Sequence, residues 1–321
     1  MLLKVFSMTM EQLITFMAFF GVGLLLGRLR VLPESTGTSL ARLVLYVFLP
    51  GMSFISFAQQ CTLPKLSGYL LMLVAGFVLL LLTLPLGELM QRRFPGNETE
   101  KLTANYSMIF PNFGYVGYPL VLAFYGAEIL SKFMMFGLPF TLFVYVLVMP
   151  KWMPSGAKRG ARELVKQIFS PTTIAILLGV AWGLIGIPVP PLIENICLTA
   201  SSCVSACAMI LTGLAIGRIS LKGAFCEKRA YLIAAIRLIA LPILFSLLAF
   251  LVCRITGLDS TLLLIVGAFT AMPLGMNPVI FCETCGRDGL FGAECAFISL
   301  IMGLFTLPLM FELQSLLAAL L

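Results

Sequence analysis

Charged residues are scarce in this sequence, and histidine is absent. Asp, Glu, Lys and Arg together make up 11% of the 321 residues, whereas a soluble domain carries about 25%. Hydrophobic residues make up 60% of the chain, and its mean hydropathy is +1.06. Such a chain lacks the polar surface that a soluble fold needs. We therefore expect an integral membrane protein.

The missing residue types also exclude several kinds of chemistry. Without histidine, the chain has no Ser-His nucleophilic site, no H-E-x-x-H zinc site and no histidine proton relay. No G-x-x-x-x-G-K-[ST] motif is present, so ATP does not bind through a P-loop of this chain. Cys282 and Cys285 form a lone C-x-x-C with no second pair to complete a metal site. We expect no enzyme activity, no cofactor and no metal.

Apolar runs long enough to cross a bilayer, about 17 to 25 residues each, recur along the whole chain. The longest polar stretch, from Pro150 to Ser170, is interpreted as a linker. We predict an all-α protein with ten transmembrane helices, over residues 10–29, 39–59, 67–90, 102–125, 130–149, 171–187, 192–216, 230–252, 260–285 and 290–312.

Lysine and arginine are distributed unevenly between the loops on the two sides of these spans. Basic loops tend to stay in the cytoplasm. The loops after spans one, three, five, seven and nine hold most of the basic residues, and the opposite face holds only Lys4, Lys65, Lys132 and Arg254. We predict extracytoplasmic termini and a location in the cell (inner or plasma) membrane. The net charge of +7 needs no nucleic-acid partner, because the anionic lipid of an inner leaflet attracts these loops.

The chain divides into two similar halves. The first span of each half contains a small-xxx-small pattern, Gly23 to Gly27 and Gly179 to Gly183, which lets helices approach closely. The fourth span of each half contains proline, glycine and asparagine at its centre. Because five spans is an odd number, the second half must be inserted upside down relative to the first. We predict two inverted five-helix repeats, residues 1–155 and 156–321.

The two fourth spans carry residues that should interrupt a membrane helix: PNFGYVGYP from Pro111 to Pro119, and MPLGMNP from Met272 to Pro278. Proline removes a backbone donor and clashes with the preceding turn, and an interrupted helix is tolerated only inside protein or beside a wet cavity. Where the two spans cross at the bilayer midplane, the half-helix N-termini would suit an anion, and Asn112 and Asn277 would add hydrogen bonds. Alternatively, both interruptions are kinks in packed helices.

Three short motifs resemble the auxin efflux carrier family, specifically its bacterial members: N-x-G-Y-x-G-x-P-L from Asn112, M-P-x-G-x-N from Met272 and F-L-P from Phe48. The resemblance covers essentially the whole chain. It implies a scaffold of spans one, two, six and seven, a transport domain of spans three to five and eight to ten that moves like an elevator, and a homodimer. It also implies organic-anion substrates, either malate or malonate or an auxin-like acid. The long cytoplasmic loop of many plant members is absent, which puts auxin in doubt.

Candidate site residues follow from the motifs and from their depth in the spans. Asn112 and Asn277 resemble the family's crossover asparagines. Tyr115 and Tyr118 are alternatively packing residues. Pro50 and Ser53 in span two alternatively form a packing kink that faces the other domain. The candidates for substrate binding are Asn112, Asn277, Gly114, Tyr115, Tyr118, Gly275, Pro50 and Ser53. The residues expected to shape the crossover, with glycines that allow close backbone approach, are Pro111, Gly117, Pro119, Pro273 and Pro278, together with Gly114 and Gly275.

Ionisable residues inside spans are costly and need a reason. Arg237, about two turns into span eight, would balance a substrate carboxylate or hold a helix end; the alternative is that it snorkels to the interface. Glu283 precedes Arg287 by four residues, the spacing of a helical ion pair, and Glu294 is expected nearby. Each glutamate is a candidate for carrying a coupling proton or for a structural ion network.

Polar residues concentrate at the two interrupted spans, whereas a channel needs a continuous polar stripe on several spans. We therefore predict a secondary transporter of small organic anions. The alternatives are a channel, a proton- or sodium-coupled symporter of another solute class, and a non-transporting receptor. Uniport, proton symport and sodium symport all remain open.

Overall fold

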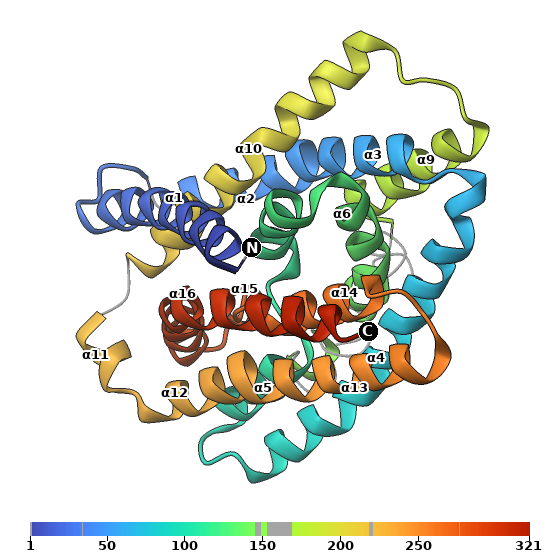
Figure 1. Ribbon diagram of the computed structural model, residues 1–321. Helices are drawn as coiled ribbons and strands as arrows, with labels where there is room; N and C mark the ends of the chain where they lie inside the picture. Colours follow the sequence, from blue (N-terminus) through green and yellow to red (C-terminus); the bar gives the residue numbers. More distant parts are fainter. Residues whose placement is uncertain (1, 34, 145–148, 153–168, 218–220, 276) are drawn as a thin grey trace.

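A computed structural model describes residues 2–33, 35–144, 149–152, 169–217, 221–275 and 277–321. These residues form helices and contain no β-strand beyond one isolated bridge. The predicted repeat boundary at residues 155 and 156 and the end of the fifth predicted span, at 145–148, lie outside the described residues. The predicted all-α class is confirmed for the part of the chain that is described (Figure 1).

Local sequence signals start the helices of the first half. Before α5, Asn97 and Glu100 form a reciprocal capping box, in which Asn97 Oδ1 accepts from the Glu100 N–H at 2.9 Å and Glu100 Oε2 accepts from the Asn97 N–H at 2.8 Å. The elements are α1 (Leu2–Arg28), α2 (Thr36–Leu43), π-helical η1 (Val44–Phe48), α3 (Leu49–Gln60), 3₁₀-helical η2 (Leu63–Lys65), α4 (Leu66–Arg93), α5 (Glu98–Ile109), π-helical η3 (Phe113–Gly117), α6 (Tyr118–Phe143) and α7 (Met149–Trp152).

In the second half, glycines in the left-handed conformation end two helices: Gly186 (φ 77°) follows α9 and Gly257 (φ 72°) follows α13. The elements are α9 (Pro171–Ile185), α10 (Pro191–Ile216), α11 (Leu221–Cys226), α12 (Lys228–Ala235), π-helical η5 (Ile236–Ala240), α13 (Leu241–Thr256), α14 (Thr261–Ala271), α15 (Asn277–Thr284) and α16 (Leu290–Ala319).

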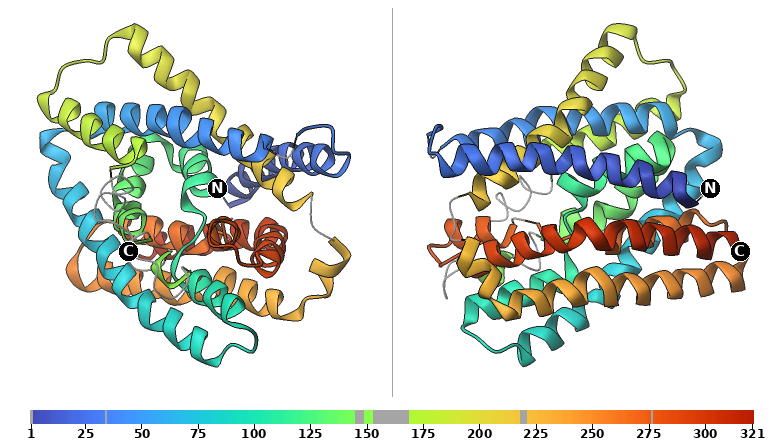
Figure 2. Two further views of the ribbon diagram at one scale, coloured as in Figure 1. Left: turned by 180° about the vertical axis from the view of Figure 1, so that it is seen from behind. Right: turned by 60° about the vertical axis from the view of Figure 1, so that its left-hand side comes forward.

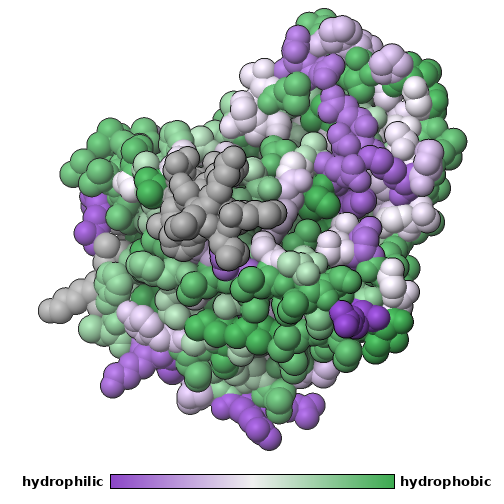
Figure 3. All heavy atoms as spheres, viewed as in Figure 1, coloured by the Kyte–Doolittle hydropathy of each residue, from purple (hydrophilic) through white to green (hydrophobic). Residues whose placement is uncertain are grey.

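Six helical stretches among the described residues are long and apolar enough to cross a membrane, and three shorter helices are also apolar. Apolar residues cover most of the face in Figure 3, as expected for a surface that contacts lipid. The chain is therefore a multi-pass membrane protein. The long stretches are Thr36–Gln60, Leu63–Arg93, Phe113–Phe143, Pro191–Ile216, Lys228–Thr256 and Leu290–Ala319.

These helices fall at the positions of the predicted spans, and the count of ten stays a prediction. The interrupted spans are divided into segments such as α5 and α14, each too short to cross a membrane alone. The second half of predicted span four and all described residues of span five are joined in α6, whose only non-helical residue is Gly126 (φ 78°, ψ −179°). That conformation is essentially restricted to glycine. It breaks the helical path between the two predicted spans, so α6 consists of two helices, one on each side of Gly126.

Each π-helical segment precedes a proline at the second position of the following helix. The prolines are Pro50 after η1, Pro119 after η3 and Pro242 after η5. Proline lacks an N–H and its ring displaces the carbonyl four residues earlier, so the preceding turn widens. These segments therefore continue the helices, with a local change in which residues face inward.

The helices pack in two groups. In the first group, α1 packs along α10, and α3 packs along α9 and α10 (Figure 1). A methyl group added at Gly23 would overlap the carbonyl of Ile210, and one added at Gly179 would lie 2.7 Å from the carbonyl oxygen of Phe54. The predicted close approach at both glycine patterns is present.

The second group contains the remaining long helices. Helix α4 packs against α5 and α6, α13 packs against α14, and α16 packs against α12 and α14. The two groups meet where α3 and α1 contact α6 and where α10 contacts η3. Both chain ends lie at the same end of the bundle (Figure 2).

Candidate functional site

The two predicted helix interruptions lie directly against each other. Helix α5 ends at Ile109 and α14 ends at Ala271, and an antiparallel bridge joins Pro111 to Leu274. The Asn112 N–H donates to the Pro273 carbonyl oxygen at 2.8 Å, and the Leu274 N–H donates to Ser299 Oγ of α16 at 3.0 Å. The second interruption thus supplies a partner to the first, and α16 supplies one to the second, as membrane-embedded backbone requires.

The four prolines at this site act in two ways. Pro111 and Pro273 lie within the interruptions, where a missing N–H breaks no helical bond. Pro119 and Pro278 are the second residues of α6 and α15, a position that favours helix initiation. The first pair therefore ends the helical path, Pro278 lies where α15 restarts it, and Pro119 follows the π-helical turn η3 with which the other path restarts.

A side chain lies close to Gly117, another lies in ordinary contact distance of Gly275, and none lies close to Gly114. A methyl group at Gly117 would lie 3.2 Å from the ring of Phe133, and one at Gly275 would lie 3.4 Å from the Asn112 side chain. No atom lies within 4 Å of the corresponding position at Gly114, so the prediction of a close backbone approach was wrong there. Open space surrounds the Gly114 Cα instead.

The two asparagines have different surroundings. Asn277 Nδ2 donates to the hydroxyl of Tyr106 at 2.8 Å, so α15 is tied to α5 across the interruption. The Asn112 side chain is 8% exposed and makes no hydrogen bond with the residues that the structure describes. A nearly buried amide with spare donors and acceptors is costly unless a ligand or water uses them. Asn112 is therefore the better placed of the two to receive a ligand.

Sequence reasoning missed Tyr106, which is buried and stacks on Phe110 with ring centroids 5.0 Å apart. A lone tyrosine in an apolar span is a weak signal, because a buried hydroxyl needs a partner but the sequence does not name it. Of the predicted tyrosines, Tyr118 is buried between Phe113 and Phe133. Tyr115 is half-buried against the core.

The span-two candidates lie on α3. Pro50 is at the start of that helix and half-buried, whereas Ser53 is fully buried and its hydroxyl has no hydrogen-bond partner among the described residues. The neighbouring residue Met52 lines a cavity of about 330 Å³ between α3, α6 and α10. Its other walls include Pro119 of α6 and three serines of α10, Ser201, Ser202 and Ser205.

This cavity has the volume of a small-ligand pocket. It begins at Pro119, the last residue of the span-four motif, and neither asparagine is part of its described lining. In Figure 3 a band of hydrophilic residues crosses the upper right of the apolar face, over the region where α3, α6 and α10 lie in Figure 1. The cavity and the paired interruptions are thus adjacent features of one region.

Arg237 lies behind the paired interruptions and is 1% exposed. Its Nε donates to the carbonyl oxygen of Met272 at 3.3 Å, and its Nη1 donates to that of Met108 at 3.4 Å. These carbonyls belong to the C-terminal ends of α14 and α5. The snorkelling interpretation was therefore wrong. The π-helical turn η5, widened before Pro242, keeps this guanidinium inside the bundle.

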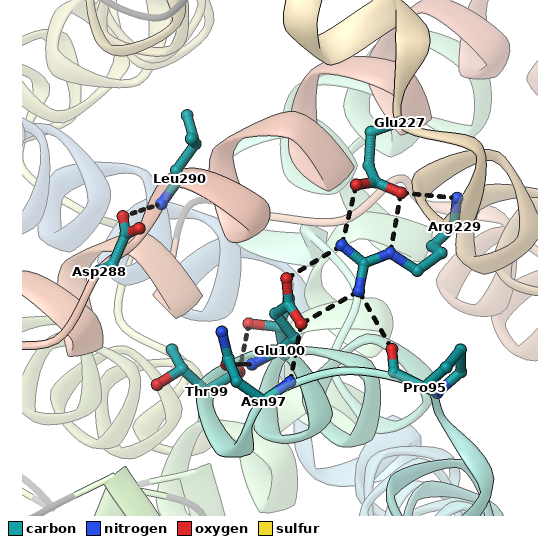
Figure 4. Close-up of polar contacts among 9 residues, drawn as sticks. Pro95, Asn97, Thr99, Glu100, Glu227, Arg229, Asp288 and Leu290 are labelled. Atoms are coloured by element: carbon teal, nitrogen blue, oxygen red, sulfur yellow. Dashed lines mark hydrogen bonds and ion pairs between the residues drawn. The ribbon is translucent and has the colours of Figure 1, made fainter.

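A separate ion network joins the α4–α5 loop to the start of α12 (Figure 4). Arg229 pairs with Glu100 and Glu227 at 3.0 and 2.9 Å, donates to the Pro95 carbonyl and lies over the ring of Phe291. Hydrogen bonds from Arg229 lower the pKa of the Glu100 and Glu227 carboxyl groups below their ordinary value.

Of the predicted acidic residues, Glu294 is 9% exposed and lies in the electrostatic field of this network. The side chain of Glu283 lies outside the part that the structure describes. The predicted helical geometry for Glu283 and Arg287 was wrong, because α15 ends at Thr284 and Gly286 turns the chain with φ 65°. The Arg287 guanidinium instead lies 3.6 Å from the Glu98 carboxylate. A structural network accounts for these contacts.

Comparison with known proteins identifies the class of protein to which this site belongs. The model of the family described as "Membrane transport protein" matches residues 6–311. The chain therefore belongs to this family of membrane transporters, and the resemblance to auxin efflux carrier-like proteins is confirmed. An "Uncharacterized transporter" of Methanothermobacter thermautotrophicus is 26% identical over 310 residues, which cover 95% of this chain and 98% of that protein.

Proposed function

We propose that this protein is a secondary transporter of small organic anions, carboxylates such as malate or malonate or an auxin-like acid. The substrate carboxylate would bind at the paired interruptions and meet the Asn112 amide. The observation that carries the proposal is the pairing itself: two broken helices bridged at Pro111 and Leu274, beside a nearly buried amide that has no partner in the described protein.

Electrostatics supports an anion over a neutral or cationic solute. The segments that restart after the breaks, η3 with α6 and α15, begin beside the bridge, and helix starts present unpaired N–H groups with partial positive charge. The buried guanidinium of Arg237 adds a full positive charge behind the same bridge. Among the described residues, Arg237 forms no ion pair that would cancel this charge.

The cavity beside Pro119 supports a small substrate. Its volume of about 330 Å³ suits an acid of a few carbons. Three serine hydroxyls on one wall would hydrogen-bond a second carboxylate or a hydroxyl group, and methionine, leucine and proline on the others would contact carbon atoms.

The proposal includes an architecture. Ten spans would form two inverted repeats, residues 1–155 and 156–321, with the interrupted spans crossing near the bilayer midplane. The group of α1, α2, α3, α9 and α10 would be the scaffold, and the other long helices would form a transport domain that moves as an elevator. The separate packing of the two groups supports this division.

Several features follow for the protein in its membrane. It would lie in the plasma or inner membrane with both termini outside, which the common location of the chain ends supports. It would work without a cofactor or nucleic acid, in contact with lipid and as a homodimer. Glu294 lies close to the ion network around Arg229, which favours a structural role over proton coupling.

Transport by purified protein in liposomes tests the proposal. Currents on a solid-supported membrane would be recorded with malate, malonate, lactate, succinate and indole-3-acetate, followed by radiolabelled uptake to detect electroneutral transport. We expect uptake of at least one acid and its loss or strong reduction in Asn112→Ala. Gly21→Ala, where no atom lies within 4 Å of the added methyl group, should keep full transport. Absence of uptake for every acid by folded protein would contradict the proposed substrate class.

A further inference from the structure

A fully buried arginine in a membrane protein requires a counterbalancing negative charge, because an isolated charge in this environment is costly. Arg237 is 1% exposed and forms no ion pair with a carboxylate of the described residues. It donates hydrogen bonds to two backbone carbonyl oxygens, those of Met108 and Met272. The negative partner must therefore come from the backbone.

Two helix dipoles supply that partner. Met108 lies in the last turn of α5, and Met272 caps the end of α14. A helix C-terminus carries about half a negative charge, so two ends directed at one guanidinium supply roughly one charge. The hydrogen bonds, at 3.3 and 3.4 Å, are longer than most N–H···O bonds. The attraction between the cation and the two dipoles is therefore the larger part of this interaction.

This arrangement has the geometry of a cation site. In secondary transporters with interrupted helices, unwound carbonyls and half-helix C-terminal ends coordinate the sodium ion that is transported with the substrate. Here the carbonyls of both interruptions converge on one positive group, and that group is covalently part of the chain. A sodium ion bound to the same oxygens would meet the guanidinium at contact distance.

We propose that the Arg237 guanidinium takes the place of a coupling cation, so that anion transport by this protein needs no sodium. This inference rests on the proposed transport of an organic anion and specifies its energetics. Arg237 neutralises the C-terminal ends of the two broken helices, so the partial positive charge of the helix starts beside the bridge is left to attract the substrate carboxylate. It is a positioning residue that attracts the anion through the crossover backbone.

The first test measures sodium binding without any substrate. The unfolding midpoint of purified protein in detergent would be followed as sodium replaces potassium at constant ionic strength. The wild-type midpoint should not change. Arg237→Ala opens a gap beside the two carbonyl oxygens, and its midpoint should rise with sodium. Arg254→Ala, an exposed arginine at the end of α13 that donates to the Leu320 carbonyl, is the matched control. A sodium-dependent rise in the wild-type midpoint would overturn the inference.

The second test uses the acid that the wild-type protein transports in liposomes. Uptake should be equal in sodium, potassium and N-methyl-D-glucamine. Arg237→Met leaves the negative helix ends beside the crossover uncompensated, so it should raise the apparent KM by roughly ten-fold or more, which corresponds to about 1.4 kcal/mol. Arg237→Lys, which keeps the charge, should recover most of that loss.

These outcomes separate the inference from the function on which it rests. Uptake that requires sodium, or an Arg237→Met variant with an unchanged KM, would overturn the role of Arg237 and leave anion transport standing. If Arg237→Met does not fold, the role of Arg237 is still tested by the wild-type unfolding midpoint and uptake in the presence and absence of sodium, and by the apparent KM of Arg237→Lys. Absence of any uptake, together with a sodium-insensitive wild-type midpoint, would contradict the transport proposal and support the assignment of the cation site.

Discussion

Replacing Arg229 by methionine should destabilise the junction between the α4–α5 loop and α12. The guanidinium makes two hydrogen bonds to each of Glu100 and Glu227 at 2.9 to 3.0 Å, and its side chain is 31% exposed. An exposed ion pair contributes about 0.2 to 1 kcal/mol, and breaking a fully buried pair costs about 3 to 5 kcal/mol. For this partly buried group we expect Arg229→Met to lower the free energy of unfolding by about 2 kcal/mol at pH 7. Lys228→Met, at the exposed neighbouring residue, should leave it unchanged.

The pH dependence makes this prediction specific. Arg229 lowers the pKa of both carboxyl groups from an ordinary value of 4.5. The contribution of the two carboxylates to the free energy of unfolding is therefore complete above pH 4.5 and is lost as the pH falls through their lowered pKa values in the folded protein. The difference between wild type and Arg229→Met, measured by unfolding in mixed detergent, should shrink below pH 4. If the free energy of unfolding differed between wild type and Arg229→Met by the same amount at pH 7 and pH 3.5, this account of the network would be refuted. It would also be refuted if the losses of stability in Arg229→Met and Glu100→Gln were additive in the double variant.

Three further substitutions test local features. Gly126→Ala should lower the free energy of unfolding by about 1 to 3 kcal/mol through backbone strain alone, since no atom lies within 4 Å of the new methyl group. The control Gly21→Ala has the same free space but lies inside a helix, so it should be neutral or slightly stabilising. Equal losses in the two variants would exclude strain as the cause. Gly23→Leu should disrupt the packing of α1 on α10, visible as a lower unfolding midpoint, and an unchanged midpoint would contradict the close approach. Tyr106→Phe removes the hydrogen bond to Asn277 and should weaken substrate binding by roughly ten-fold or less, whereas a gain in affinity would show that the bond competes with substrate.

The sequence was sufficient to predict the helical class and both interruptions, because proline and glycine act locally on the backbone. The motifs at Pro111 and Met272 therefore located the breaks. A break also lies between the predicted spans 102–125 and 130–149, at Gly126, whose backbone is not helical. The π-helical segments η1, η3 and η5 were not predicted, because their widening depends on how the displaced carbonyl finds another donor.

Side-chain partnerships across the bundle could not be predicted from spacing. The burial of Arg237 depends on two distant helices ending at the same place. Its position two turns into a span is equally compatible with snorkelling, which the structure excludes. Likewise, Glu283 and Arg287 have helical spacing, but Gly286 ends the helical geometry between them. The partner of Asn277, Tyr106, lies 171 residues away in the sequence. Such contacts arise from tertiary packing, which no local pattern encodes.

The most direct test of the central claim is the affinity of Asn112→Ala for the acid that the wild-type protein transports. Asn112 is chosen because its amide has no partner in the described protein, so its removal breaks no internal hydrogen bond of the side chain. Losing one hydrogen bond to a charged group should weaken binding by roughly 10-fold to 150-fold, with the unfolding midpoint and the exposed control Asn195→Ala unchanged. Wild-type affinity in Asn112→Ala would contradict anion binding at the paired interruptions.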